Sequence, residues 1–462
     1  MALGRRGTRT GSMFIAATDL PKSGGHPFYA ALNRLLAEAN FDRIVEGMCE
    51  DAYADRKGRP SIPPGVYFRM YFIGYFEGID SQRGIAWRCN DSLALREFLG
   101  LGLDERTPDH SSLTVIRKRL SSKIHEAVFA LVLGIAQQHG LLKGKTVGVD
   151  ATTLEANAAM KSIVRKDTGE DWKEYLRRMA QDAGVGDPTD EDLRRFDKKR
   201  GSKKRVSNDD WESPSDPDSQ IAKMKDGRTH LAYKAEHAVD LDSQIVVAAT
   251  IHPAGCSDAA SLEVTIASAR EMLATIEHET EIEEIVADKG YHSIAALTFC
   301  AEEGLRTYIP SKKQPGRRRW SDKPAEAKIA VCSNDRRARG RRGRELQRMR
   351  SERVERSFAH VCETGGARRS WLRGFADVAK RYLTTVAAHN LARVLLSLIG
   401  FGKPKGMQGR HQAAKDAFLA HLDSMFAVFA AWFAKLVTNT LFDSRRLTRR
   451  GERLRSSVLL VA

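Results

Sequence analysis

Two short hydrophobic segments, each ending at an aspartate, constrain this chain more than any other feature. Residues 146–150 end at Asp150, and residues 283–288 end at Asp288. Short runs rich in β-branched residues are typical of buried strands. If the two strands pair in parallel, both carboxylates lie at the same edge of one sheet. The chain is therefore predicted to fold around an α/β sheet that carries acidic side chains at one edge.

Further strand and helix signals follow these segments. Residues 229–239 and 244–251 flank a turn at 240–243 and predict a β-hairpin. His237 and Asp240 on this hairpin could approach the acidic site, but a structural role is the preferred interpretation. Other predicted elements are helices over 257–276, 293–303 and 378–399 and a strand over 306–310. A hairpin combined with helical connections indicates a sheet of mixed strand directions.

The preceding region, residues 25–140, is predicted to be helical, because its apolar residues recur at three- and four-residue spacing. Within it, a turn is followed by Ser111 and Ser112, which can cap a helix, and then by Arg117 and Lys118. This order suits a helix-turn-helix motif with the hydroxyls and cations facing DNA. An ordinary helical bundle gives the same pattern. We expect an all-α DNA-binding domain here.

The charge of the chain points to a polyanionic partner. The 462 residues include 75 Lys+Arg and 59 Asp+Glu, which gives a formal net charge of +16. Phosphates attract such a surface, and an anionic membrane is the competing explanation. The most apolar stretch, 425–437, is too short to span a bilayer. Six scattered cysteines without a CxxC pair argue against a zinc cluster or a disulfide framework. We therefore expect a cytoplasmic protein without membrane association.

Four segments have compositions that set them apart from the two folded regions. Residues 1–24 are expected to be a disordered basic arm and 161–227 a polar, flexible or helical insertion. Residues 401–462 form a basic extension to which we assign no function. Residues 311–356 are intensely basic but lead into a segment with helically spaced apolar residues, so they are expected to be tethered to the fold.

A third acid, Glu355, lies on the helix predicted at the end of this basic stretch. Asp150, Asp288 and Glu355 together would form an oxygen-only ligand set, which suits Mg²⁺ or Mn²⁺ far better than zinc. Two such ions can activate a nucleophile and stabilise the leaving oxygen of a phosphoryl displacement. Taken singly, each aspartate is also explained by turn chemistry, and Glu355 by a surface ion pair with Arg353 or Arg356.

At this point the sequence resembles a known family. Residues 147–152, 286–291 and 350–358 resemble the three catalytic blocks of the DDE transposases of bacterial insertion sequences, in the broad IS-four and IS-five superfamily. Residues 58–64 and 108–112 resemble the helical N-terminal domain that in this family binds terminal inverted repeats. The three blocks in this order, behind that domain, make the resemblance specific.

The resemblance implies a ribonuclease H-like fold for residues 145–400, with Asp150, Asp288 and Glu355 as catalytic residues and as ligands of two Mg²⁺ or Mn²⁺ ions. It implies metal-dependent DNA strand cleavage followed by strand transfer. The implied partners are double-stranded DNA, both inverted repeats and target, and a second copy of the chain in a homodimer or higher multimer. The implied location is the bacterial cytoplasm, in association with the nucleoid.

Four residues of the second and third blocks are candidates for binding DNA phosphates: Lys289, Tyr291, Arg350 and Arg353. Arginine is suited to this role because its guanidinium offers two parallel donors. The chain departs from the family pattern at Gln347, where a tyrosine is frequent, and at Cys362, where a lysine is frequent. Arg368 and Arg369 could replace the phosphate contact of that lysine.

Glu352 is the rival for the third acid, since it lies three residues before Glu355 on nearly the same predicted helical face. We prefer Glu355 because it lies in the Val-Glu-Arg-Ser-Phe context. Two alternative functions also stay open from sequence: an inactive or domesticated transposase that only binds DNA, and a ribonuclease H-like nuclease.

Overall fold

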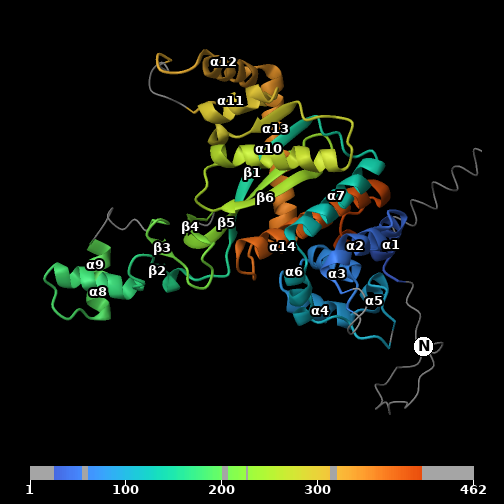
Figure 1. Ribbon diagram of the computed structural model, residues 1–462, viewed down its shortest axis with the longest axis horizontal. Coiled ribbons are helices and arrows are strands. Elements are labelled where there is room, and N and C mark those ends of the chain that lie inside the picture. Colours follow the sequence, from blue (N-terminus) through green and yellow to red (C-terminus); the bar gives the residue numbers. More distant parts are fainter. Residues whose placement is uncertain are drawn as a thin grey trace, which may run out of the picture. The chain divides into compact units, whose positions relative to one another are not determined.

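The computed structural model describes residues 25–54, 61–102, 104–199, 207–224, 227–312 and 320–407 (Figure 1). Contacts divide the chain into two units, residues 1–403 and 404–462. Of the second unit, only the single turn Pro404–Met407 is described. The predicted N-terminal arm, residues 58–60 of the family-like motif and the predicted C-terminal extension from 408 onward lie outside the described residues.

The N-terminal region is helical, as predicted. A helix begins at Pro64 because proline is well tolerated in the first helical turn, and another begins after Asp109, whose carboxylate accepts a hydrogen bond from Ser112 N at 2.8 Å. The helices of this region are α1 (Pro27–Glu38), α2 (Phe41–Cys49), α3 (Pro64–Glu77), α4 (Gln82–Asp91), α5 (Leu93–Phe98), α6 (His110–Arg119) and α7 (Ser122–Gln138).

A mixed sheet follows the helical region. Its strands are β1 (Thr146–Glu155), β4 (Gln220–Lys223), β5 (Thr229–Asp240), β6 (Val246–Pro253), β7 (Glu284–Ala287) and β8 (Arg306–Tyr308). β1, β7 and β8 are parallel neighbours in this order. β5 pairs antiparallel with β1 on one side and with β6 and β4 on the other. The predicted parallel pairing of the two strands is therefore confirmed, but the expectation that the first strand ends at Asp150 is wrong, because β1 continues past it to Glu155 and pairs with β5 along that length.

Helices cover both faces of this sheet (Figure 1). They are α10 (Asp258–Thr275), α11 (Ile294–Glu302), α12 (Ala325–Arg339), α13 (Arg341–Phe358) and α14 (Phe375–Ile399). Successive residues of a strand point to opposite faces. On β5, His237 contacts α13 and α14, whereas its neighbour Glu236 contacts Ser261 and Thr265 of α10. Every layer of the domain is thus in contact with the sheet.

The β5–β6 hairpin has the structural role that its sequence predicted. Asp240 ends β5 and accepts hydrogen bonds from Lys143 N at 2.8 Å and from Ser243 Oγ at 2.7 Å. His237 Nδ1 lies 2.8 Å from Ser357 Oγ, and its Nε2 lies 2.8 Å from Tyr382 Oη. These contacts fix the turn and join the strand to two helices.

Burial lowers the pKa of five described histidines, among them His360 and His389 of the region around α14. The pKa of His237 falls to about 3, and those of His125 and His252 fall to about 4. The cause in each case is the loss of hydration by the charged imidazole, which an apolar interior does not replace. These five side chains are the low-pKa histidines of the described chain.

Helix α14 joins the helical region to the sheet. Its His389 Nδ1 lies 3.1 Å from Tyr75 Oη of α3, and its Asn390 Nδ2 donates to Val246 O of β6 at 2.8 Å. Because of such contacts, the helical region and the sheet belong to one compact unit, and the predicted boundary at 140–145 marks a change of element type only. Phe375–Met407 is long and apolar enough to cross a membrane, but 61% of its apolar window is buried inside the protein, as in a core helix.

The predicted insertion contains two short strands, β2 (Val164–Arg165) and β3 (Trp211–Glu212), and two helices, α8 (Trp172–Asp182) and α9 (Asp190–Lys199). The helices have a small core of their own, formed by Leu176, Ala180, Leu193, Trp172 and Phe196. The expectation that the insertion extends to residue 227 is wrong, because Gln220–Lys223 forms the edge strand β4 of the main sheet.

Candidate active site

Asp150 and Asp288 lie side by side at the edge of the sheet. Val149 of β1 is the register partner of Ala287 of β7, and each aspartate is the next residue of its chain segment. The carboxylate of Asp288 is near enough to raise the pKa of Asp150 by repulsion. Asp288 Oδ1 also accepts a hydrogen bond from Gly290 N at 2.6 Å, which caps the short turn Lys289–Tyr291.

The Asp150 carboxylate is held on both oxygens. Oδ1 accepts from Ala151 N at 2.8 Å, and Oδ2 accepts from Arg350 Nη1 at 2.6 Å. Burial raises the pKa of Asp150 above its ordinary value, and the Arg350 guanidinium opposes this shift. Because Arg350 is 9% exposed and paired with Asp150, the expectation that it contacts DNA is corrected: it is a counter-ion inside the site.

Glu355 lies on α13, five residues after Arg350, and its side chain is exposed. Gln347, Ser351 and Glu355 are four residues apart and share one side of the helix. Gln347 Nε2 donates to Ala287 O at 2.9 Å and to Tyr308 O at 2.6 Å, at the ends of β7 and β8. Ser351 Oγ donates to Glu355 Oε1 at 3.1 Å. The described contacts of Glu355 include neither Asp150 nor Asp288, so the structure does not bring the three predicted acids together.

Glu352, the rival acid, has a different environment. Its Oε1 accepts from Arg356 Nη2 at 2.7 Å, one helical turn later, and both side chains are largely exposed. Arg353 lies on the other flank of the helix and donates to Asp242 O at 3.4 Å, at the β5–β6 turn.

The acidic side chains have the chemistry of a divalent-cation site, although their grouping is incomplete. Within the described ranges, no three Asp, Glu, His or Cys side chains are close enough together to hold a metal ion. Asp150 and Asp288 are adjacent and offer only oxygen atoms, and the buried Arg350 is the counter-charge of Asp150. Such a pair fits a hard cation such as Mg²⁺ or Mn²⁺.

Beneath the turn that follows Asp288 lies a buried polar network that the sequence analysis missed. Glu236 on β5 is fully buried and accepts hydrogen bonds from Tyr291 Oη at 2.6 Å, from Ser261 Oγ at 2.8 Å and from Thr265. The expectation that Tyr291 contacts DNA is therefore wrong: its ring is buried and its hydroxyl binds Glu236. The signal that could have revealed this network was a pair of opposite charges, Lys234 and Glu236, two residues apart and so on one face of a predicted strand.

Lys234 and Asp258 extend this network to the surface. Lys234 Nζ donates to Ser261 Oγ at 2.8 Å and forms an ion pair with Asp258 Oδ1 at 2.7 Å. Gly290 packs against both acids: a Cβ there would overlap Asp258 Oδ2 and lie 2.8 Å from Asp288 Oδ1. Only glycine fits this turn without displacing a carboxylate. Lys289, in the same turn as Gly290, is exposed.

The predicted DNA-binding residues of α6 separate into two groups. Ser112 N and Ser111 Oγ both donate to Asp109, at 2.8 and 2.7 Å, and these bonds lower the pKa of Asp109 to about 2. Ser111 is exposed at the start of the helix, and Lys118 is exposed near its end. These residues stay available to a partner.

Arg117, also on α6, is not available to a DNA partner. Its side chain is 4% exposed and its Nε lies 3.3 Å from Asp377 Oδ2 of α14. The expectation that Arg117 faces DNA is therefore wrong. Its spacing from Leu113, which is buried, indicates the inward face of α6 and could have shown this in the sequence.

The departures from the family pattern have structural explanations. Cys362 is buried and its thiol contacts Tyr382 Oη. Arg368, considered above as a substitute phosphate contact, donates to Thr152 Oγ1 at 3.0 Å and to Thr153 O at 2.8 Å. It ties the segment after α13 to the far end of β1.

Comparison with protein families identifies the chain. The model described as "Transposase domain (DUF772)" matches residues 20–119, and the one described as "Transposase DDE domain" matches residues 165–391. The protein is a DDE transposase. The second match includes Asp288 and Glu355, and Asp150 precedes it. A comparison with curated proteins finds no match.

This assignment accounts for the architecture. A DDE domain implies a ribonuclease H-like fold, and the mixed sheet of the transposase with helices on both faces agrees with it. The family acts on DNA and uses divalent metal ions. The function expected from the sequence, transposition of DNA, is thereby confirmed.

Proposed function

We propose that the transposase cuts DNA at the terminal inverted repeats of its own element and joins the released ends to a target. Asp150, Asp288 and Glu355 are the catalytic residues in this proposal, and they would hold two Mg²⁺ or Mn²⁺ ions. The register of β1 with β7 is the observation that carries it, because it brings two acids to one edge of the sheet. Helix α13, which bears Glu355, contacts Asp150 through Arg350 and the end of β7 through Gln347.

The reaction consists of two in-line displacements at phosphorus. In the first, water attacks a phosphodiester and a 3′ oxygen leaves; in the second, that 3′-hydroxyl attacks a target phosphodiester and a new 3′ oxygen leaves. The metal ions, when bound, supply charge stabilisation for the attacking and leaving oxygens. Ala151 N and Gly290 N orient the two aspartates through hydrogen bonds. Arg350 balances part of the charge of Asp150, and the exposed Lys289 would bind a substrate phosphate.

The remaining finer assignments belong to the same proposal. The helical region would bind the inverted repeats through exposed polar groups of α6, including Ser111 and Lys118. Two copies of the chain would pair the two element ends, since one active site acts on one strand at a time. The chain would belong to the IS-four and IS-five superfamily and would act at the bacterial nucleoid.

The test is cleavage of a labelled duplex taken from the DNA that flanks the coding sequence. Wild type is assayed with Mg²⁺, with Mn²⁺ and with EDTA, beside the variants Asp150→Asn, Asp288→Asn and Glu355→Gln. Each variant is expected to lose cleavage and to retain binding of the same duplex, measured by fluorescence anisotropy. Retention of binding separates loss of chemistry from loss of folding.

Glu352→Gln is the matched control, because it makes the same change three residues away on the same helix. It is expected to keep most of the activity, since Glu352 is paired with Arg356. If Glu352→Gln is inactive and Glu355→Gln is active, the third acid is Glu352. If wild type binds the duplex but cuts it under none of the metal conditions, the chain acts only as a DNA-binding protein.

A further inference from the structure

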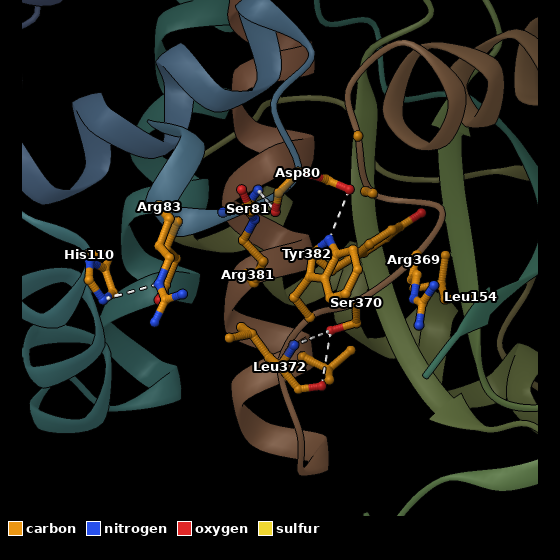
Figure 2. Close-up of a pocket in the computed structure, with 15 residues that line it drawn as sticks. Asp80, Ser81, Arg83, His110, Leu154, Arg369, Ser370, Leu372, Arg381 and Tyr382 are labelled. Atoms are coloured by element: carbon orange, nitrogen blue, oxygen red, sulfur yellow. Dashed lines mark hydrogen bonds between the residues drawn. The ribbon is translucent and has the colours of Figure 1, made fainter. Parts of the chain in front are cut away.

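A cavity of about 280 Å³ lies between the helical region and the sheet domain, away from the catalytic acids (Figure 2). The N-terminal ends of α4 and α6 form one wall, and the segment that follows α13 forms the other. Leu154 on β1 and Tyr382 on α14 also line it. The volume is at the lower end of the range for small-molecule sites, so the cavity admits a group about the size of a nucleobase and excludes a duplex.

Trp371 presents an aromatic surface in this cavity. Trp371 is 45% exposed, whereas tryptophan side chains are on average mostly buried because they are large and apolar. The ring is held in place by a hydrogen bond from Nε1 to Asp80 Oδ2 at 2.8 Å. Its backbone carbonyl accepts from Asn157 Nδ2 at 3.0 Å. The indole is therefore fixed and still accessible.

Arginines surround this aromatic surface. The Arg369 guanidinium lies 4.5 Å from the centroid of the Trp371 ring, and its Nε forms a long ion pair with Glu155 Oε1 at 3.8 Å. Its side chain remains exposed, so the terminal nitrogens can also reach a phosphate. On the opposite wall, Arg83 is exposed and its Nε lies 3.4 Å from His110 Nε2. Figure 2 shows Arg83 with His110 on one side of the cavity and Arg369 on the other. Arg381 is occupied by the carbonyl of Asp80 at 3.2 Å. The carboxylate of Asp80 accepts the hydrogen bond from Trp371 Nε1 described above.

The cavity also lies within reach of the catalytic edge. Leu154 is four residues beyond Asp150 on β1, which corresponds to a backbone separation of roughly 13 Å. That distance is about four nucleotide steps of a B-form strand. A DNA strand that occupies the active site can therefore extend to the cavity.

We propose that this cavity binds an unpaired nucleotide of the DNA substrate, with its base stacked on Trp371 and neighbouring phosphates at Arg83 and Arg369. A fixed aromatic surface beside arginines is the combination with which proteins bind single-stranded DNA without sequence preference. The proposal rests on the DNA-cutting function proposed above and adds to it a site for a strand that has left the duplex.

The experiment measures the affinity of the full-length protein for three fluorescein-labelled probes with an identical duplex part. One probe is blunt, one carries a single-stranded tail of thymidines, and one carries a tail of the same length made of abasic sites. The two tails have the same phosphates, so the difference between them isolates contacts with bases. Wild type is expected to bind the thymidine tail at least about fivefold more tightly than the abasic tail.

Trp371→Ala is expected to abolish this difference, and Trp371→Phe, which keeps a ring, to preserve most of it. Arg83→Gln is expected to weaken binding of both tailed probes without affecting the blunt one. There are two matched controls outside the cavity. Trp87→Ala removes a 76% exposed tryptophan of α4, the helix that also carries Arg83, and Arg34→Gln removes an exposed arginine of α1. Neither control should change the preference for the thymidine tail.

Two results would overturn the proposal. One is equal affinity of wild type for the thymidine and abasic tails; the other is a preference that survives in Trp371→Ala. In both cases continued binding and metal-dependent cutting of the blunt duplex would leave the proposed function intact. Loss of duplex cutting by wild type, with a thymidine preference that depends on Trp371, would instead contradict the proposed function alone.

Discussion

Removing the hydroxyl of Tyr291 tests whether the buried network under the site positions Asp288. Tyr291 is three residues from Asp288 and belongs to the turn that Asp288 caps. Its hydroxyl donates at 2.6 Å to Glu236, which is fully buried and also accepts from Ser261 and Thr265. In Tyr291→Phe a buried acceptor loses one of these three donors. The expected cost is about 1–3 kcal/mol in the free energy of unfolding.

The same change is expected to slow cleavage. Displacement of a catalytic group by about 1 Å can cost on the order of a hundredfold in rate. We therefore expect Tyr291→Phe to lower kcat about tenfold or more and to raise the Mn²⁺ concentration needed for half-maximal activity. The free energy of unfolding is measured by urea denaturation and the rate by single-turnover cleavage of a labelled duplex.

Thr265→Val is the matched control for this prediction. It removes another donor to the same Glu236 carboxylate, but from α10 and without touching the turn of Asp288. The two variants should lose similar stability, while only Tyr291→Phe should shift the Mn²⁺ requirement. Equal effects of both variants on rate and on the Mn²⁺ midpoint would refute a positioning role and leave Tyr291 a purely structural residue.

Three further predictions follow from the packing and the charges. Gly290→Ala should slow cleavage because its Cβ would displace the carboxylate of Asp258 or Asp288, whereas Gly186→Ala, whose Cβ would meet open space, should be fully active in the same assay. Lys118→Gln should reduce the salt dependence of DNA binding by about one phosphate contact; Arg117→Gln should lower the melting temperature and leave that slope unchanged, and a reduced slope would contradict its buried position. The low-pKa histidines should make the free energy of unfolding depend on pH. Their pKa values in the folded protein lie below the unfolded value of about 6.5. Between the folded and the unfolded pKa, the unfolded chain therefore binds more protons than the folded chain. The melting temperature should therefore be constant above about pH 7 and fall as the pH is lowered toward 4, and an unchanged melting temperature over that range would show that these imidazoles are not buried neutral.

Much of this transposase is determined by local sequence. The hydrophobic runs before Asp150 and Asp288, the hairpin turn at Asp240 and the helical periodicity of residues 25–140 depend on neighbouring residues and were predicted correctly, although β1 continues past Asp150 to Glu155. The runs suffice to bring the aspartates together because strand pairing in a parallel sheet has a fixed direction, so residues that follow register partners lie side by side.

Other features depend on which side of an element meets a distant partner, and only the tertiary structure decides this. Arg117, Tyr291 and Arg350 carry the residue types of phosphate contacts, yet each is buried against a partner far away in sequence: Asp377, Glu236 and Asp150 respectively. Local sequence cannot show such partners, because a cation or hydroxyl is equally suited to DNA and to a buried carboxylate. The residue type determines the chemistry that is possible, and burial determines which partner is available for it.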